Sequence, residues 1–480
     1  MLFGFLHKRP ALPTIHLHNT ATGRKEEFKS LEKGVVTMYS CGPTVYDHIH
    51  IGNLRAYLLP DLLTRLFLRY GYKVKSTINF TDFGHLTDDA DAGEDKMMKG
   101  MRREGYEITL ENMRIFPLPY IESFKNDNLA FGNLPPSEYA RASDYIAEQI
   151  KLIETLEQKG YTYRISDGVY FDVTKFPAYG IIGNIDIEKI KAGARVEVNP
   201  EKHHPADFAL WKNGDLGWES RWGKGFPGWH IECTAMVFAT LGKQIDVHTG
   251  GEDLQYTHHN GEIAQAECVT GKKYVSYWLH NSHVKIDQQK IAKSLGNGLR
   301  LRHLSDRGFA PADYRFWLLQ SHYRTTANFT WEALEAARAG LLRLRRLVYE
   351  ELGDVTPGKI DENYEGRVLQ AVADDLDTPT ALAILFELAK DQKVHPENKL
   401  ATIHFIDSLL ALGLSKGAAE GRAELGVIDE IPDEVKKLLE DREEARQARD
   451  FALADHLRDQ ITAQGYLIED GSDGAKLRKK

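Results

Sequence analysis

The chain has 480 residues, more than one compact core usually holds, so two to four domains are expected. Hydrophobic residues make up 42% of the sequence and charged residues 27%, proportions that exclude wholesale disorder. The net charge of -9 excludes a basic surface over the whole molecule, although a single face can still bind nucleic acid. The three cysteines, Cys41, Cys233 and Cys268, are too few for the disulfide framework of a small secreted protein.

The first ten residues, MLFGFLHKRP, place a short apolar run before Lys8 and Arg9. A signal peptide has the opposite charge order, and this run is too short to span a bilayer. We therefore expect a cytoplasmic protein without a membrane segment.

The first predicted elements form a βαβ unit. Residues 35–41 and 73–80 are rich in β-formers, and residues 54–70 between them have helical periodicity. This order predicts two parallel strands joined by a helix. Because ligands bind beyond the carboxyl ends of parallel strands, the segment that follows residue 41 is a candidate site.

Between residues 118 and 205 the pattern changes to a helix and two short β-rich runs, which predicts an inserted α+β unit. The sheet is expected to resume with a helix after Gly228, a strand at 244–248 and a helix after His258.

Beyond Trp331 nearly all of the sequence has helical periodicity, including residues 365–388, which predicts a helix bundle. Residues 413–426 have the composition of a linker. A last helical stretch is expected from residue 431 to its end at Gly465.

Residues 41–53, CGPTVYDHIHIGN, lie where the first predicted strand ends and the helix begins. Gly52 permits close approach of a ligand to the backbone, the helix N-terminus favours anions, and His50 can donate to a phosphate oxygen. The segment is therefore a candidate phosphate site. A plain capped turn with surface histidines explains the same residues.

Two shorter motifs could also contact a nucleotide. Gly250 and Gly251 precede Asp253, whose carboxylate could hold ribose hydroxyls, although a β-turn before a helix explains the motif equally well. Lys290 and Lys293 lie three apart and could neutralise the charge on a leaving pyrophosphate. A solvated lysine pair is the commoner explanation of that spacing.

A metal site could be built from residues far apart in the sequence. His258 and Glu262 lie four apart and so share one face of a helix. With Cys41 and Cys233 they would complete a tetrahedral zinc site. Because no Cys-x-x-Cys spacing occurs, two buried core cysteines remain the alternative.

Four segments together resemble the cysteinyl-tRNA synthetase family in order and spacing: CGPTVYD-x-x-HIG, GWHIEC-x-AM, GGEDL followed by HH-x-x-EIAQ, and K-x-x-KSLGN. The likeness extends from residues 16–20 to residues 442–455 and so covers nearly the whole chain. It implies a ligase that activates L-cysteine with ATP, releases diphosphate and transfers cysteine to the 3′ end of tRNA(Cys).

The resemblance implies an α/β fold with a Rossmann-type class I catalytic domain, a connecting insertion, an all-α bundle and a C-terminal anticodon-binding domain. The expected boundaries are 1–117 for the first half of the catalytic domain, 118–205 for the insertion, 206–275 for the second half, 276–330 for the KMSKS-loop and stem-contact region, 331–426 for the bundle and 427–480 for the anticodon-binding domain. A monomer is expected, with tRNA(Cys), ATP and L-cysteine as partners.

The resemblance also assigns roles to residues. One Zn2+ per chain is expected at the metal ligands Cys41, Cys233, His258 and Glu262, with the substrate thiolate completing the coordination. The expected catalytic residues are His50, Asn53, Lys290 and Lys293. ATP, accompanied by Mg2+, is expected at Gly52, Asp253 and Lys293, and the cysteine pocket at Gly42, Thr81 and Trp229.

Zinc would account for discrimination against serine. An apolar pocket separates near-isosteres by only about 1–3 kcal/mol. A zinc ion lowers the pKa of the cysteine thiol and binds the thiolate, whereas the serine hydroxyl stays protonated and is a poor ligand. No editing domain is then required.

The sequence departs from the family pattern at several positions. Asn53 replaces the second histidine of the HIGH signature, and residues 291–292 replace the Met and Ser of KMSKS. Asn260 and Gly261 replace Glu and Asn, and a glycine there loosens the helix by about 1 kcal/mol. Leu477 replaces a tryptophan that helps to read the anticodon, so we expect the neighbouring basic residues to contact phosphate.

Two other functions remain open. A related ligase delivers cysteinyl adenylate to a sugar amine, but that class lacks the segment that extends here from residue 431 to residue 480. A catalytically silent RNA-binding paralogue would be expected to lose zinc ligands or loop lysines, all of which are present here.

Overall fold

The computed structural model describes residues 12–84, 95–186, 199–291, 298–427, 431–471 and 474–479. The chain divides into two units, one from Met1–Ala337 with Gly366–Leu382 and the other from Arg338–Glu365 with Ala383–Lys480. No helix in the described ranges combines the length and the apolar character that crossing a bilayer requires.

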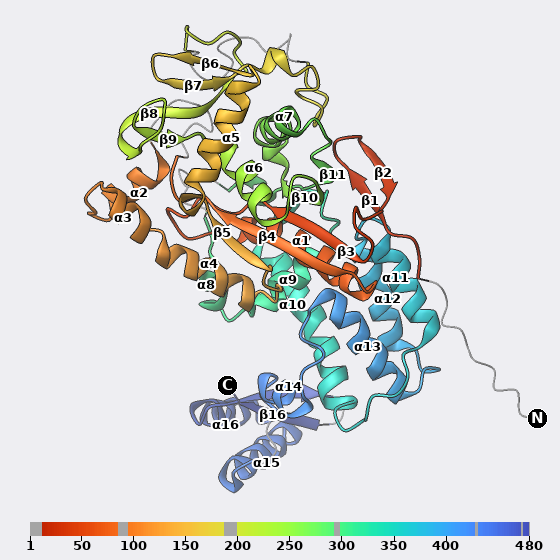
Figure 1. Ribbon diagram of the computed structural model, residues 1–480. Helices are drawn as coiled ribbons and strands as arrows, with labels where there is room; N and C mark the ends of the chain where they lie inside the picture. Colours follow the sequence, from red (N-terminus) through yellow and green to blue (C-terminus); the bar gives the residue numbers. More distant parts are fainter. Residues whose placement is uncertain are drawn as a thin grey trace, which may run out of the picture. The chain divides into compact units, whose positions relative to one another are not determined.

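A parallel sheet with strand order β11-β10-β3-β4-β5 forms the centre of the first unit (Figure 1). Its strands are β3 (Val35–Ser40), β4 (Lys73–Phe80), β5 (Glu138–Arg141), β10 (Ile245–Gly251) and β11 (Val275–Asn281). The predicted βαβ unit is confirmed, since β3 and β4 pair in parallel and α1 (Ile51–Arg69) connects them. The predicted α/β class is confirmed as well.

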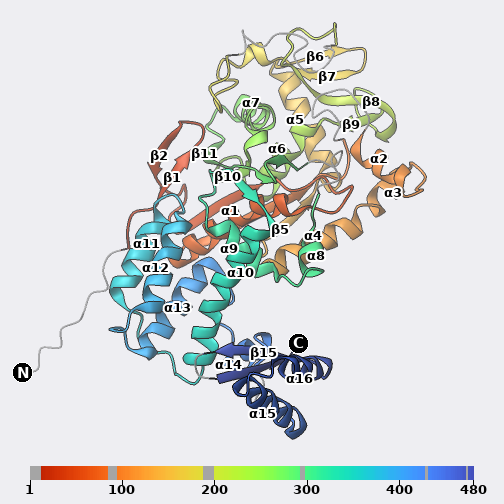
Figure 2. The same cartoon turned by 180° about the vertical axis from the view of Figure 1, so that it is seen from behind.

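Helices cover both faces of this sheet (Figures 1 and 2). On one face α1 lies beside α4 (Leu118–Ala130), where the rings of Tyr57 and Phe124 meet edge to face with centroids 4.7 Å apart. On the other face α5 (Ile146–Gln158), α6 (Trp229–Thr240) and α7 (His258–Thr270) pack against one another. The helices expected after Gly228 and His258 are therefore present.

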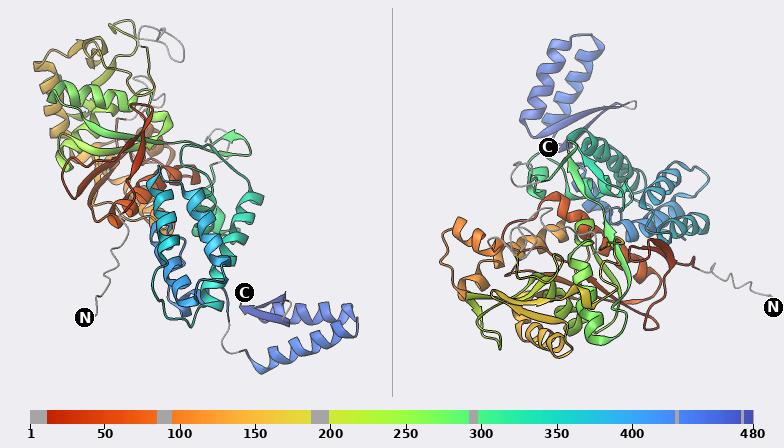
Figure 3. Two further views of the ribbon diagram at one scale, coloured as in Figure 1. Left: turned by 90° about the vertical axis from the view of Figure 1, so that its right-hand side faces the viewer. Right: turned by 90° about the horizontal axis from the view of Figure 1, so that it is seen from above.

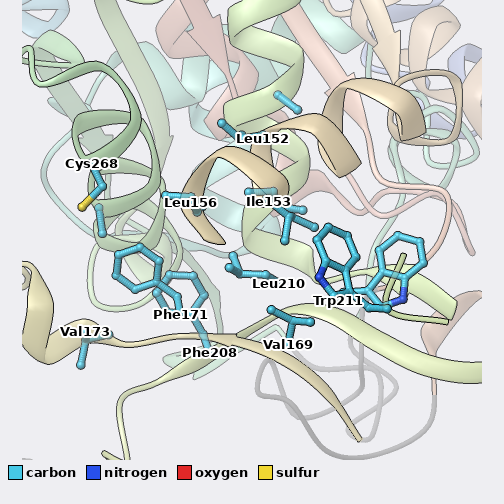
Figure 4. Close-up of a cluster of buried hydrophobic side chains, with 14 of the residues drawn as sticks. Leu152, Ile153, Leu156, Val169, Phe171, Val173, Phe208, Leu210, Trp211 and Cys268 are labelled. Atoms are coloured by element: carbon cyan, nitrogen blue, oxygen red, sulfur yellow. The ribbon is translucent and has the colours of Figure 1, made fainter. Parts of the chain in front are cut away.

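The inserted unit contains an antiparallel sheet of order β6-β7-β8-β9. Its strands are β6 (Thr162–Ile165), β7 (Gly168–Phe171), β8 (Phe208–Trp218) and β9 (Gly225–Pro227). Side chains of α5, such as Leu152 and Leu156, pack against Phe171, Leu210 and Trp211 of the sheet (Figure 4).

This sheet extends beyond the boundary that we expect at residue 205, because β8 and β9 continue it as far as Pro227. Conversely, β5 lies inside the expected insertion but pairs with β4 of the parallel sheet. An apolar run shows that a strand is buried, but its hydrophobicity does not show which sheet the strand joins.

The remaining elements of the first unit are short. They are β1 (His16–Asn19), β2 (Arg24–Glu27), α2 (Lys96–Arg103), α3 (Leu110–Ile115), η1 (Ala142–Asp144), η2 (Val173–Lys175), η4 (Glu252–Leu254), β12 (Val284–Ile286), β13 (Gln289–Lys290), α8 (Leu301–Ser305), α9 (Pro311–Leu319) and β14 (Ala327–Phe329).

The predicted helical character beyond Trp331 is present, but its details differ. The elements are α10 (Trp331–Arg346), a π-helical turn (Leu347–Glu351), α11 (Glu362–Ala373), α12 (Thr378–Lys390), α13 (Pro396–Leu410), α14 (Ala418–Glu424), α15 (Asp433–Gln447), α16 (Phe451–Ala463), β15 (Tyr466–Gly471) and β16 (Gly474–Lys479). Residues 365–388 form two helices, because Asp375 and Leu376 take left-handed backbone angles between them. Asp375 is held there by the backbone N–H of His18 and the hydroxyl of Tyr323, contacts that periodicity does not reveal.

The predicted linker at 413–426 contains α14, and the last helical stretch is two helices followed by a hairpin. Figure 3 shows the β15–β16 hairpin beside α16, which pairs with α15. Leu477 of β16 is buried against Val435 and Ile461. Because the basic residues at 476–479 suggest a solvated tail, the sequence alone does not predict this strand.

A buried ion pair between Asp61 of α1 and Arg315 of α9 supports the first unit. Arg315 donates to the Asp61 carboxylate and, at 2.8 Å, to Asn133 Oδ1. Both charged groups are buried. Arg315→Met would leave the buried Asp61 carboxylate with Arg65, at 3.0 Å, as its remaining cationic partner. The free energy of unfolding is therefore expected to fall by about 1–3 kcal/mol.

Thermal and urea unfolding of this variant should be compared with those of Arg164→Met. Arg164 pairs with Glu157 at 3.0 Å, but it lies half-exposed, and such surface pairs contribute about 0–1 kcal/mol. Equal losses in the two variants would contradict the role of the buried pair.

Candidate active site

The carboxyl ends of β3, β4 and β10 meet at one edge of the parallel sheet, and predicted site residues follow each strand. Cys41 follows β3, Thr81 follows β4, and Asp253 lies in η4 directly after β10. The Cys41 N–H donates to the carbonyl of Thr249 at 3.2 Å, and the Thr81 N–H donates to that of Pro43 at 3.2 Å. These backbone bonds fix the three strand ends relative to one another.

Two adjoining cavities open at this edge. The larger, of about 270 Å3, is lined by the predicted metal and cysteine-pocket residues Cys41, Gly42, Thr81, Trp229, Cys233 and His258. The smaller, of about 180 Å3, is lined by the predicted ATP-site residues His50, Gly52, Asn53 and Asp253. Both cavities are lined by Asn53, Ala56, Gly251 and Asp253, so the two predicted subsites are neighbours.

Two glycines allow close approaches at this edge. A Cβ at Gly42 would lie 1.5 Å from the backbone oxygen of Asn79, and the Gly42 N–H donates to Asn79 Oδ1 at 2.8 Å. A Cβ at Gly251 would lie 2.4 Å from Asp253 Oδ1. A larger residue at position 42 would therefore displace the backbone at Asn79, which lines the larger cavity. A larger residue at position 251 would displace the Asp253 carboxylate.

The N-terminus of α1 faces the smaller cavity. His50 is the N-cap residue, and its backbone N–H donates to Asn53 Oδ1 at 3.0 Å. Asn53, which replaces the second histidine of the HIGH signature, therefore caps the helix through its oxygen. Its Nδ2 amide is the group that can donate to a ligand.

The four predicted metal ligands lie together. The donor atoms of Cys41, Cys233, His258 and Glu262 are all within 4.8 Å of one another. His258 Nε2 lies 3.2 Å and Cys41 Sγ 3.9 Å from Glu262 Oε1. Burial raises the pKa of both thiols, and the proximity of Cys233 raises that of Cys41 further. Two thiols, an imidazole and a carboxylate at this spacing are a donor set that fits zinc, whose charge would favour the thiolates.

The structure adds two histidines that the sequence reasoning missed. Cys41, His248, His259 and Glu262 form a second, overlapping group of possible donors. His248 Nε2 lies 3.1 Å from Glu262 Oε2, and His259 Nδ1 lies 2.6 Å from His280 Nε2. The pKa of His259 lies well below its usual value, mainly because the ring is buried and further because His248 and His280 lie beside it. The HH pair at 258–259 was a visible signal, but the position of His248 depends on the register of β10.

Trp229 and Thr81 are held by their neighbours. The Trp229 ring stacks on His258 with centroids 4.3 Å apart and an interplanar angle of 26°. The Thr81 hydroxyl donates to Glu232 Oε2 at 2.9 Å and lies 3.3 Å from Asn79 Nδ2. A hydrogen-bonded chain thus joins the turn after β3, through Asn79 and Thr81, to the helix that carries Cys233.

The predicted lysines are described only in part. Lys290 is the last residue of β13, and Lys293 lies outside the described residues, so both assignments stay predictions. Ile291 lines the smaller cavity, and a Cβ at Gly52 would lie 2.8 Å from Ile291 Cδ1. Ile291, which directly follows β13, is therefore in contact with the N-terminus of α1.

The family described as "tRNA synthetases class I (C) catalytic domain" matches residues 27–339. Among solved structures, the methionyl-tRNA synthetase of Mycobacterium tuberculosis bound by methionyl-adenylate aligns with a TM-score of 0.57 and 12% identity, over 83% of this chain and 95% of that one. The LeuRS of Agrobacterium radiobacter K84, in a ternary complex with tRNA and LeuAMS, aligns with a TM-score of 0.59 and 13% identity, over 82% and 86%. The fold and the catalytic-domain match define a class I aminoacyl-tRNA synthetase.

Sequence relatives narrow the class. The cysteine–tRNA ligase of Treponema denticola is 39% identical over 97% of this chain and 100% of its own. Cysteine–tRNA ligase 1 of Burkholderia lata is 42% identical over 96% of each chain. The family described as "Cysteinyl-tRNA ligase anticodon binding domain" matches residues 429–478. The chain belongs to the cysteine–tRNA ligase family.

Proposed function

We propose that this chain activates L-cysteine with ATP, releases diphosphate and transfers cysteine from the adenylate to the 3′ end of tRNA(Cys). The observation that carries this proposal is the position of Cys41, Cys233 and His258 in the wall of one cavity, directly beside a second cavity at the N-terminus of α1. The first offers a thiophilic site and the second an anion site, as the two substrates require. A cytoplasmic monomer is part of the proposal.

Zinc is the metal that we propose, held by Cys41, Cys233, His258 and Glu262. Three of these four residues line the larger cavity, whereas His248 and His259 of the overlapping group do not. A catalytic zinc needs an open position facing its substrate, which favours the first group. When bound there, zinc would lower the pKa of the substrate thiol and accept the thiolate, which distinguishes cysteine from serine.

Adenylation is expected to proceed by attack of the cysteine carboxylate on the α-phosphorus of Mg2+-bound ATP. The bond from the α-phosphorus to the bridging oxygen breaks, so cysteinyl adenylate forms and pyrophosphate leaves. His50 and the Gly52 turn would hold phosphate oxygens at the helix N-terminus, and Asp253 would bind the ribose hydroxyls. Thr81 and Trp229 would shape the cysteine pocket. Lys290 and Lys293 would neutralise the departing pyrophosphate, so catalysis rests on positioning and charge.

Pyrophosphate exchange into ATP tests this proposal. Exchange should depend on cysteine and be at least about a thousandfold slower with serine, a ratio beyond the roughly 10- to 200-fold of a purely apolar pocket. Charging of a tRNA(Cys) transcript should follow in the same preparation. Exchange without charging would favour the sugar-amine ligase, which the match to an anticodon-binding family already disfavours. Folded, zinc-loaded protein without exchange would favour the silent paralogue.

Anticodon contact is proposed for the C-terminal domain, but not through Leu477 or Arg478 of its last strand. Leu477 is buried in the domain core, and Arg478 is buried and paired with Glu350 at 2.8 Å and Glu469 at 3.1 Å. Arg478 therefore contributes to domain structure, which corrects the expectation that it contacts phosphate. Phe451, at the start of α16, is 64% exposed and offers an aromatic face.

Phe451→Ala is therefore expected to weaken binding of tRNA(Cys) by about fivefold or more, because a base stacked on an aromatic ring contributes about 1–3 kcal/mol. Filter binding or fluorescence anisotropy measures this directly, with Phe451→Trp expected to retain affinity. Leu467→Ala, which removes an exposed aliphatic side chain of β15, is the control. Equal affinity of Phe451→Ala and the unmodified protein would contradict the assignment.

A further inference from the structure

Tyr256 is an exposed aromatic residue that is close in sequence to residues lining the larger cavity. It lies between Leu254 and His258, both of which line that cavity, and it is 57% exposed. A single exposed aromatic residue is ordinary on a protein surface. The hydrogen bonds that hold the backbone around the Tyr256 ring are more informative, because they show that the ring is restrained.

One buried side chain fixes the segments on both sides of the ring. The Asn260 amide Nδ2 donates to the carbonyl of Gln255 at 2.7 Å and to that of Ile182 at 3.0 Å. Its Oδ1 accepts the backbone N–H of Ile182 at 3.1 Å. Asn260 is 1% exposed, so these bonds are protected from water. It therefore anchors the residue before Tyr256 and the residue before Gly183.

Gly183 provides the surface against which the ring packs. Its φ of +83° lies in the left-handed region, and an added Cβ would lie 3.2 Å from Tyr256 Cε1 and 3.3 Å from Cδ1. One edge of the ring thus packs against bare backbone while much of the residue stays exposed. An aromatic ring restrained in this way loses little conformational entropy when a ligand stacks on it.

We propose that Tyr256 is a stacking platform for an unpaired base at the 3′ end of tRNA(Cys), a residue role that rests on the function proposed above. The single-stranded end must reach the adenylate from outside the cavity, and unpaired bases are commonly held by stacking on aromatic side chains. The adenine of ATP is a less suitable occupant. Tyr256 lines neither cavity, but its neighbours Leu254 and His258 line the larger one, whereas ATP is placed in the smaller one at the α1 N-terminus.

A double-mutant cycle tests the proposal. The affinities of the unmodified protein and of Tyr256→Ala are measured for a full-length tRNA(Cys) transcript and for one that lacks its two 3′-terminal nucleotides. Removing the nucleotides should weaken binding to the unmodified protein about tenfold, which corresponds to about 1.4 kcal/mol. Tyr256→Ala should bind the full-length transcript about tenfold more weakly and should bind both transcripts with the same affinity. Tyr256→Phe should behave as the unmodified protein. Tyr106→Ala, at another exposed tyrosine, is the control.

The two half-reactions separate this role from a structural one. In Tyr256→Ala the ratio of charging rate to pyrophosphate exchange rate should fall about tenfold, with the metal content retained. If Tyr256→Ala bound the full-length and the shortened transcript with the same affinities as the unmodified protein, the proposal would be overturned. A raised KM of Tyr256→Ala for ATP would also overturn it, because that result would place adenine on the ring. Absence of cysteine-dependent exchange in the unmodified protein would instead contradict the proposed function itself.

Discussion

Cys233→Ser should lose its bound zinc and its cysteine-dependent pyrophosphate exchange together, each by at least about a hundredfold. Cys233 is 1% exposed, and its sulfur belongs to the cluster of donors within 4.8 Å of one another. A serine hydroxyl stays protonated at neutral pH and is a poor zinc ligand. Changes outside the ligand shell already cost tenfold to a hundredfold in affinity or activity, so loss of a ligand is expected to cost more.

Metal analysis of purified protein beside the exchange assay measures both effects. Cys268→Ala is the matched control, because Cys268 lies in the hydrophobic core of the inserted unit, outside both groups of potential ligands. Its burial raises the pKa of the thiol to about 11, which keeps it protonated and a weak competitor for metal. Full zinc content in Cys233→Ser would contradict the ligand assignment. A normal exchange rate without zinc would contradict the proposed role of the metal.

The local order of the catalytic fold could be predicted from the sequence, because periodicity and glycine breaks report on each element alone. Residues 35–41, 54–70 and 73–80 become β3, α1 and β4, with boundaries that shift by only a few residues. Membership of a sheet depends on partners far along the chain. For that reason the expected boundaries of the insertion at residues 118 and 205 place β5 inside it and β8 outside it, whereas β5 pairs with β4 and β8 pairs with β7.

The site could be predicted as a set of motifs, whereas its connections could not. Cys41 and Cys233 are far apart in the sequence, and only the fold places both in one cavity wall. The hydrogen-bonded chain through Asn79, Thr81 and Glu232 joins three elements that no short motif links. Asn260, a departure from the family pattern, likewise acquires a role only when Ile182 of the inserted unit is seen against it.

Gly42→Ala should slow cysteine-dependent exchange about a hundredfold while leaving the protein folded. The added methyl would lie 1.5 Å from the Asn79 carbonyl oxygen and 2.6 Å from its carbon, and backbone atoms cannot yield as a flexible side chain can. The turn after β3 must therefore shift and carry Cys41 with it. A displacement of about 1 Å at a reacting group can reduce the rate about a hundredfold, and such overpacking costs about 1–3 kcal/mol of stability.

The matched control is Gly366→Ala, in the interior of α11, where an added Cβ meets nothing within 4 Å. Alanine there should raise the free energy of unfolding by about 0.5–1 kcal/mol and leave exchange unaltered, because it improves helix propensity without a clash. Thermal unfolding and exchange kinetics should be measured on both variants. If Gly42→Ala exchanged as fast as Gly366→Ala, the close approach of Gly42 to Asn79 would not be needed for catalysis. If the KM for cysteine rose much more than the KM for ATP in Gly42→Ala, the substitution would have disturbed the part of the site that binds the cysteine thiol, where Cys41 lies.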